Sequence, residues 1–227
     1  MANPEQIHLI RQGVETWNQW RNENPTVQID LTEADLSEGD LSEANLRNAD
    51  LNHANLEEAE LIEANLVGAN LVSANLSRTN LREADLSHAN LTQANLNDVY
   101  LLAGFLRSAN LQRANLVNAN LIGANFWEAD LSEAELTTAN LSGGFFRKAK
   151  LNGANLSKAQ LVQANLDYAE LIGACLVGAR LIEADLSYAN LTDANALAAN
   201  FQDAVMTGAC LDRWRVNEYT NLNFAFS

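Results

Sequence analysis

The sequence predicts an all-β fold, a four-sided parallel β-helix, and three regularities with a common five-residue period indicate it. From residue 31 to residue 211, every fifth residue is Leu in 32 of 37 positions, and the register never slips. The residue two places before each Leu position is Ala in 31 of 36 cases, and the residue one place before is Asp or Asn in 25 of 37. The repeated unit therefore reads Ala-(Asp/Asn)-Leu-x-x.

A period of five suits neither type of straight element. On an α-helix, successive Leu residues would rotate by about 140° around the axis, and on a flat strand an odd period would turn each Leu to the opposite face. The chain must therefore turn once in each repeat. Within a repeat, Ala and Leu are two residues apart and point to the same side of an extended segment, so the Asp or Asn between them points outward. The last two residues form the corner.

Four such repeats close one coil if each corner turns through about a right angle. Coils of twenty residues, stacked at the usual strand spacing of about 4.8 Å, pair every backbone with its neighbours. Leu then stacks on Leu, small Ala lets the walls approach each other inside, and Asp or Asn can hydrogen-bond its local backbone. The 37 repeats predict about nine coils, and we expect residues 26–216 to form this rod.

The repeated unit resembles the pentapeptide-repeat family, whose motif matches residues 30–211 almost unit for unit, about four-fifths of the chain. The resemblance implies a right-handed quadrilateral β-helix, built from β-bridges and tight turns, with the central Leu and the preceding Ala inside. It also points to a cyanobacterial-type member, because the family is especially abundant in cyanobacteria. Leucine-rich repeats have periods near twenty too, but their leucines are unevenly spaced.

An open stack of coils would expose unpaired edges, and the N-terminal residues predict a cover for one of them. Asn3 can cap a helix that has Pro4 at its first position, and Gln6 completes a capping-box-like pattern. Apolar residues follow at helical spacing until the Asn-Pro pair at residues 24–25: Ile7, Ile10, Val14 and Trp17. We expect residues 1–25 to form one amphipathic helix that caps the first coil.

Residues 217–227 are expected to close the other end. Trp214 stands where the repeat has Ala and Val216 where it has Leu, so the register continues for one more unit. It is then broken by Leu222, Phe224 and Phe226. These large side chains can plug the last coil or join two molecules end to end, so both a monomer and an end-to-end dimer stay open.

The chain is strongly acidic, with a formal net charge of -15. Residues 1–90 hold 16 acidic and 5 basic side chains, whereas residues 91–227 hold 13 and 9. This balance argues against direct binding to nucleic acid or to an anionic membrane, because both require a basic face.

The N-terminal residues lack a basic segment followed by an apolar one, so we expect a cytoplasmic protein. Cys175 and Cys210 are expected to be free thiols.

No catalytic or metal-binding motif stands out. The three histidines, His8, His53 and His88, are far apart in the chain, and no Cys lies at ligand spacing from them. Neighbouring carboxylates such as Glu57 and Glu58 lie on convex walls, where no cleft would tune them for acid–base catalysis. We expect no enzyme activity, no cofactor and no metal.

Function is expected to reside in the outward side chains, because the repeat dictates the inward ones. The fourth wall, whose central residues run from Leu46 to Met206 in steps of twenty, is rich in aromatic and basic residues, which are enriched at interfaces. With a neighbour on the third wall, they form the candidate partner-binding set: Tyr100, Phe105, Arg107, Trp127, Phe145, Arg147, Lys148, Tyr168 and Tyr188. The sequence predicts a protein-interaction or scaffolding surface for an unidentified protein partner.

A structural explanation of the same residues stays open. Phe105 and Phe145 can replace Asp or Asn where corners relax beside Gly104 and Gly144, and aromatic side chains can stack down a wall for stability. The third wall adds an aliphatic column that would either pack as a ladder or enlarge the patch. This column consists of Ile62, Leu102, Ile122, Val162 and Ile182.

The alternative function rests on the acidic first two coils, where residues 30–63 hold eleven acidic side chains against the single Arg47. Some pentapeptide-repeat proteins protect type II topoisomerases from quinolones, and the resemblance implies an acidic rod that imitates nucleic acid. The chain lacks a recognisable C-terminal dimerising helix and the long projecting loop of some of those proteins. Nine of the eleven form the candidate acidic patch: Asp30, Glu33, Asp35, Glu38, Asp40, Glu43, Glu57, Glu58 and Glu63. A gyrase supercoiling-inhibition assay separates this function from a general scaffold.

Overall fold

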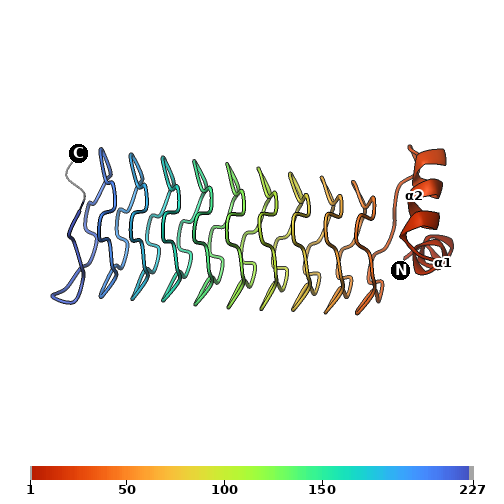
Figure 1. Ribbon diagram of the computed structural model, residues 1–227, viewed down its shortest axis with the longest axis horizontal. Coiled ribbons are helices and arrows are strands. Elements are labelled where there is room, and N and C mark those ends of the chain that lie inside the picture. Colours follow the sequence, from red (N-terminus) through yellow and green to blue (C-terminus); the bar gives the residue numbers. More distant parts are fainter. Residues whose placement is uncertain (1, 225–227) are drawn as a thin grey trace.

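The chain forms a rod with two short helices at its N-terminal end and the C-terminal segment at the opposite end (Figure 1). A computed structural model describes residues 2–224. Parallel β-bridges join each residue before a Leu position to the residue twenty places later, from Asp30–Asp50 to Asn195–Arg215. Each wall therefore holds isolated bridges, and the described residues contain no longer β-strand. The twenty-residue coil and its register follow the predicted period.

The interior of the rod consists almost entirely of the Leu and Ala positions of the repeat. Leu96 and Ala94 are typical in having no exposed surface. Phe126, Phe146 and Phe201 replace Leu at three positions and are also fully buried. The rings of Phe126 and Phe146 lie in adjacent coils and stack with centroids 4.8 Å apart. Burial of apolar surface stabilises by about 25 cal/mol per Å², so this continuous column is the main source of the rod's stability.

Backbone hydrogen bonds repeat in the same pattern along the rod. The amide of Leu91 donates to the carbonyl of Asn110 at 2.6 Å, and the amide of Gln93 donates to that of Gln112 at 2.9 Å, both in the next coil. The amide of Ala94 closes the turn by donating to the carbonyl of Leu91 at 3.0 Å. One amide per repeat, that of the residue directly after Leu, remains without a backbone acceptor.

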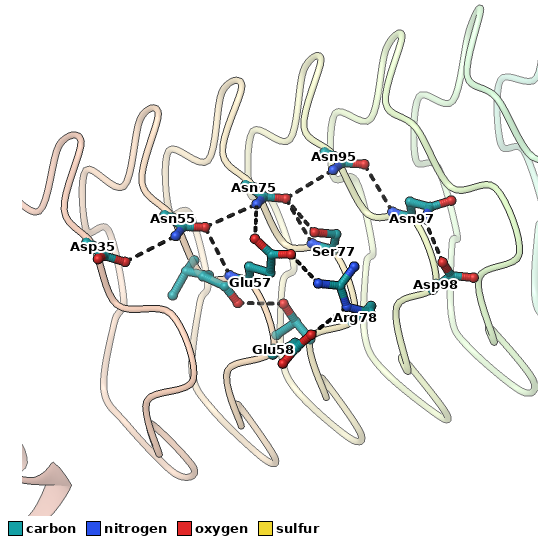
Figure 2. A network of polar contacts seen from close by, with 12 residues as sticks. Asp35, Asn55, Glu57, Glu58, Asn75, Ser77, Arg78, Asn95, Asn97 and Asp98 are labelled. Atoms are coloured by element: carbon teal, nitrogen blue, oxygen red, sulfur yellow. Dashed lines mark hydrogen bonds and ion pairs between the residues drawn. The ribbon is translucent and has the colours of Figure 1, made fainter.

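The outward Asp or Asn supplies that acceptor. The amide of Thr92, for example, donates to Oδ1 of Asn90 at 3.2 Å, which is the local bond expected of these side chains. On the second wall, the side-chain amides also bond to the coil before them at 3.0–3.1 Å. This ladder, seen in Figure 2, runs through Asp35, Asn55, Asn75 and Asn95.

The second residue after each Leu position has a positive φ throughout the rod. From residue 33 to residue 213 these angles lie between 51° and 69°, and seven of the residues are Gly. The left-handed conformation costs a non-glycine residue roughly 1–2 kcal/mol, and β-branched residues suit it least. Thr138, with a φ of 60°, is the β-branched member of this set within residues 2–224.

Thr138→Gly is therefore expected to raise the free energy of unfolding by about 1 kcal/mol, because Gly adopts this conformation without steric cost. The matched control is Thr137→Gly, in the same turn but without a positive φ, which should lower it. Urea denaturation of the two variants measures both changes. A Thr138→Gly variant that is no more stable than the wild type would contradict the strain.

The N-terminal segment contains two helices, α1 (Pro4–Arg11) and α2 (Val14–Glu23), so the prediction of one continuous helix is wrong. They are separated at Gly13, whose φ of 112° is incompatible with a continuing helix. The predicted cap is present, since Asn3 Oδ1 accepts hydrogen bonds from the amides of Glu5 and Gln6 at 3.0 and 3.4 Å. Helix α2 ends before Asn24, as the Asn-Pro pair indicates.

The predicted capping box is also wrong, because Gln6 bonds to the rod instead of to the start of its own helix. Its side chain donates to the carbonyl of Gln28 at 3.0 Å and accepts from the amide of Asp30 at 2.7 Å. Other helix side chains donate to carbonyls of the first coil at 3.0 Å. These pairs are Arg11 with Asp35, Trp17 with Asn45, Asn18 with Glu43, and Arg21 with Arg47. The helices therefore satisfy backbone groups that an open edge would leave unpaired.

At the C-terminal end, the register continues through the bridge at Arg215 and then gains one residue, since Asn200 pairs with Asn221. The rings of Phe201 and Trp214 meet with centroids 5.6 Å apart, and Trp214 and Phe224 pack partly buried against the core. The predicted contribution of Phe226 lies outside the described residues.

Neither of the helices in the described part of the chain has the length and apolar character needed to cross a membrane.

Candidate functional site

Most of the predicted partner-binding residues line up in columns on the fourth wall, because residues twenty apart occupy the same place in successive coils. Phe105, Asn125 and Phe145 follow one another before the central position and are joined by bridges. Phe105 and Phe145 are 48% and 53% exposed, a large fraction for phenylalanine. The column directly after the central position holds Arg107, Trp127 and Arg147.

These columns enclose a shallow pocket of about 200 Å³ whose exposed lining is mainly apolar. Trp127, Phe145 and Arg147 form its walls, and Asn125 and Asn165 complete it. Sequence reasoning missed the two Asn residues because they match the repeat. Their signal was positional, since each lies in the column of Phe145, one coil before it or one coil after it.

Trp127 is held in place by its neighbours. The guanidinium carbon of Arg107 lies 4.2 Å from the centroid of the indole ring, a cation–π contact. The amide of Trp127 donates to Oδ1 of Asn125 at 3.0 Å. On the far side of the pocket, Arg147 Nε lies 3.2 Å from Oδ2 of Asp167. The pocket walls are therefore fixed by contacts along the rod.

The expected relaxation of the corners is seen at Gly104, whose amide lies 3.5 Å from the carbonyl of Leu101, but not at Gly144. The amide of Gly144 donates to the carbonyl of Leu141 at 3.0 Å, and the amide of Phe145 donates to the carbonyl of Ala124 at 3.0 Å. Both bonds are those of a regular repeat. Gly144 is required for another reason, because a Cβ there would lie 2.6 Å from Cε2 of the buried Phe146 ring. Phe146 thus occupies the space that the Ala methyl fills in other repeats.

The remaining predicted residues lie away from this pocket. Tyr168 and Tyr188 are exposed and stack with ring centroids 4.8 Å apart, and they follow Lys148 in one column at the corner after the fourth wall. Tyr100, 58% exposed, borders a separate depression with Asp98. The structure therefore brings together the phenylalanine, tryptophan and arginine residues, with the tyrosines outside the pocket. On the third wall, Leu102 and Ile122 of the aliphatic column are exposed.

The fourth wall is electrically neutral on an otherwise acidic rod. Its outward residues comprise four basic and four acidic side chains, namely Arg47, Arg107, Arg147 and Lys148 against Asp85, Glu128, Asp167 and Asp185. The other three walls together hold 21 acidic and 8 basic side chains, a net of -13. The exposed Phe105 and Phe145 thus lie on the wall with the smallest net negative charge.

The acidic residues of the alternative site are spread over three walls. Glu57 and Glu58 pair with Arg78, whose Nε donates to Glu58 Oε1 at 2.7 Å and whose Nη2 donates to Glu57 (Figure 2). Hydrogen bonds from Ser37 lower the pKa of Asp35, and those from Ser42 lower the pKa of Asp40. The first wall holds Asp30 and Glu33, and the third holds Asp40, Glu43 and Glu63. Part of this set therefore serves the turns and the contacts between coils.

Both cysteines are unpaired, as expected from the sequence. Cys175 and Cys210 occupy outward positions that are Asp or Asn in most repeats. Hydrogen bonds from Thr192 and from the backbone at Asp212 lower the pKa of Cys210. The thiol sulfur of each cysteine lies near the hydroxyl group of the preceding coil, at 3.2 Å from Ser157 and 3.4 Å from Thr192.

The protein-family model for pentapeptide repeats matches the sequence at residues 29–66, 59–98, 109–147, 146–181 and 179–213. The chain belongs to the pentapeptide-repeat family. The right-handed quadrilateral β-helix implied by the resemblance is the fold of this family. Among curated proteins, no sequence match is found.

Two solved structures of cyanobacterial pentapeptide-repeat proteins resemble the chain, one over most of its length and one over half of it. HetL, from the cyanobacterium Nostoc sp. strain PCC 7120 and involved in heterocyst differentiation regulation, is 33% identical with a TM-score of 0.69. The match covers 87% of this chain and 93% of HetL. Rfr23, from the cyanobacterium Cyanothece 51142, is 29% identical with a TM-score of 0.47, over 50% of this chain and 91% of Rfr23.

Proposed function

We propose that this pentapeptide-repeat protein is a non-enzymatic interaction module whose fourth wall binds a protein partner. The observation that carries the proposal is the cluster of the exposed Phe105 and Phe145 with the half-buried Trp127 and with Arg107 and Arg147, on the one neutral wall of the rod. Burying exposed aromatic surface against a partner is favourable, and neutrality removes the long-range repulsion that the other walls would impose on an acidic partner. The regular backbone makes this surface rigid, so binding orders little of it.

Stability of the rod does not require this cluster, which supports a role in binding. The consensus Asn at the position of Phe145 would accept the amide of Arg147, as Asn125 accepts that of Trp127. Phe145 gives up that bond and leaves half of its own surface in water. A substitution that costs a local hydrogen bond and exposes a large ring fits selection for an external contact.

Similarity to HetL supports a regulatory setting for this binding. HetL is involved in heterocyst differentiation regulation, and the match spans nearly all of both chains. We propose accordingly that the partner is a protein of a regulatory process in a cyanobacterial-type cell. The rod would present the fourth wall as a scaffold to that partner.

Trp127→Ser combined with Phe145→Ser is expected to abolish partner capture from an extract of the native host. Loss of the cation–π contact should cost the rod only about 1 kcal/mol, so the fold should persist by circular dichroism and thermal melting. Quantitative mass spectrometry of the captured proteins, wild type against variant, measures the effect.

Ile172→Ser combined with Tyr219→Ser provides the matched control, because both side chains are exposed apolar groups away from the fourth wall. This control variant should capture the same proteins as the wild type. An unchanged set of captured proteins in the fourth-wall variant would falsify the proposal.

The acidic alternative, mimicry of nucleic acid toward a type II topoisomerase, gains no specific support. Its carboxylates lie on three walls, and Arg78 neutralises part of the second. A duplex carries about one negative charge per 1.7 Å of its axis, whereas several of these carboxylates are paired with Arg78 or accept hydrogen bonds in turns. The fourth wall is therefore the better-supported interaction surface.

We also propose a division into an N-terminal cap at residues 1–25, a rod at residues 26–216 and a terminal segment at residues 217–227. The bonds from α1 and α2 to the first coil support a capping role for the helices. Packing of Trp214 against Phe201 supports closure of the C-terminal end within one molecule. A monomer is the state favoured by these contacts.

A further inference from the structure

The pocket on the fourth wall has the size and lining of a site for one side chain. Its volume of about 200 Å³ and its mainly apolar exposed surface suit a phenylalanine or leucine side chain, and no larger cofactor. Trp127 and Phe145 supply the apolar sides. An anchor of this kind, seated in a preformed pocket, is what hot spots at protein interfaces require.

One hydrogen-bond donor at this pocket, the backbone amide of Arg147, lacks a side-chain partner. Nε1 of Trp127 also has no hydrogen-bond partner, but it is fully covered and does not face a ligand in the pocket. Because residue 145 is Phe, the amide of Arg147 lacks the side-chain acceptor that serves Trp127 one coil earlier. An unpaired donor next to an apolar surface favours a ligand that brings an acceptor.

Local charge points the same way. Over the coils that form the pocket, residues 105–168, the outward residues of the fourth wall comprise three basic side chains, Arg107, Arg147 and Lys148, against the two acidic ones Glu128 and Asp167, the latter paired with Arg147. This local excess of positive charge lies on a chain of net charge -15. A cationic ligand would be attracted to the other walls, whereas a carboxylate finds its complement here.

We propose that the pocket between Trp127 and Phe145 binds a partner segment in which a large apolar side chain is flanked by carboxylates. The apolar side chain fills the pocket, and the carboxylates accept hydrogen bonds from Arg147 and its neighbours. This inference rests on the proposed function and specifies the partner's chemistry: an acidic peptide segment with an aromatic or aliphatic anchor.

Three N-acetylated, C-amidated tripeptides, Glu-Phe-Glu, Gln-Phe-Gln and Lys-Phe-Lys, provide the probes. The full chain is labelled with 5-fluorotryptophan, and the fluorine resonances of its four tryptophans are followed during titration. Trp17, Trp20 and Trp214 lie at the ends of the rod and serve as internal controls. We expect only the Trp127 resonance to shift, with Glu-Phe-Glu binding about fivefold more tightly than Lys-Phe-Lys.

Two variants separate the components of the site. Phe145→Ser should weaken binding of all three peptides by about tenfold, because the anchor loses an apolar wall. Arg147→Gln changes a residue that lines the pocket, so it should weaken Glu-Phe-Glu binding more than Gln-Phe-Gln binding and remove the preference for Glu-Phe-Glu over Gln-Phe-Gln. Both residues are exposed, so each variant is expected to keep the fold. An unmoved Trp127 resonance, or Lys-Phe-Lys binding as tightly as Glu-Phe-Glu, would overturn the inference.

Failure of this inference is distinguishable from failure of the proposed function. Partner capture that depends on Trp127 and Phe145, without any preference among the tripeptides, would refute the acidic-anchor chemistry and leave the fourth wall as the binding surface. Capture that is unaffected by the double substitution would refute the proposed function itself.

Discussion

Replacing Phe146 by Ala is expected to lower the free energy of unfolding by about 3–5 kcal/mol. The ring is fully buried, stacks on Phe126 and fills the space above Gly144. Its removal leaves a cavity that the rigid coils on either side cannot close, since their backbones are fixed by hydrogen bonds. Urea denaturation followed by circular dichroism measures the loss.

A double-mutant cycle with Gly144 identifies the cause. Gly144→Ala alone should cost about 1–3 kcal/mol, because its Cβ would meet the Phe146 ring. In combination with Phe146→Leu, the same substitution should be favourable, since the pair restores the Ala-x-Leu unit of the other repeats. Additive effects of the two substitutions would show that the ring does not occupy the space above Gly144.

Prediction from the sequence succeeded where one side chain type recurs with one period. The column of Leu and Ala determines which residues lie inside, and the turn after each Leu follows because five residues return the chain to the same environment. The outward Asn that accepts the amide of Thr92 was predictable for the same reason. A feature that recurs in most repeats can be predicted from the pattern even where a single repeat departs from it.

Features confined to one position were not predictable in this way. The break at Gly13 reflects two helix segments that each bond to the first coil, an outcome of tertiary contacts. Gly144 was misread because its partner, the Phe146 ring, reaches back over its own repeat. The wall that carries the aromatic residues was predictable from the period of twenty, whereas the pocket depends on rotamers and on Asn125 and Asn165, which look like consensus residues.

The neutral wall shows how a repetitive fold can carry a specific surface. Most outward side chains on the rod can change without altering the coil, because the backbone bridges and the buried column form independently of them, whereas the Asp or Asn before each Leu also accepts a backbone amide. Charge and aromatic character can therefore vary from wall to wall within one chain. The ends of the rod are more constrained, because each open edge must be covered by residues from outside the repeat.

Trp17→Ala should produce the largest effect at such an edge. The indole is fully buried, its Nε1 donates to the carbonyl of Asn45 at 3.0 Å, and its ring lies 5.6 Å from that of Trp20. Its loss should cost about 3–5 kcal/mol, concentrated at α2 and the first coil, because each coil contacts only its neighbours. Amide hydrogen exchange should accelerate there and remain slow in the middle of the rod.

The same substitution should expose the first edge to a second molecule. Once α2 detaches, the carbonyls of Glu43, Asn45 and Arg47 lose their side-chain donors and become free to pair with another chain. Light scattering should therefore detect concentration-dependent association of Trp17→Ala. Trp17→Phe, which keeps most of the apolar bulk and loses the hydrogen bond, should remain monodisperse with a smaller loss of stability. If Trp17→Ala also remained monodisperse with unchanged exchange in the first coil, the helices would not act as a cap.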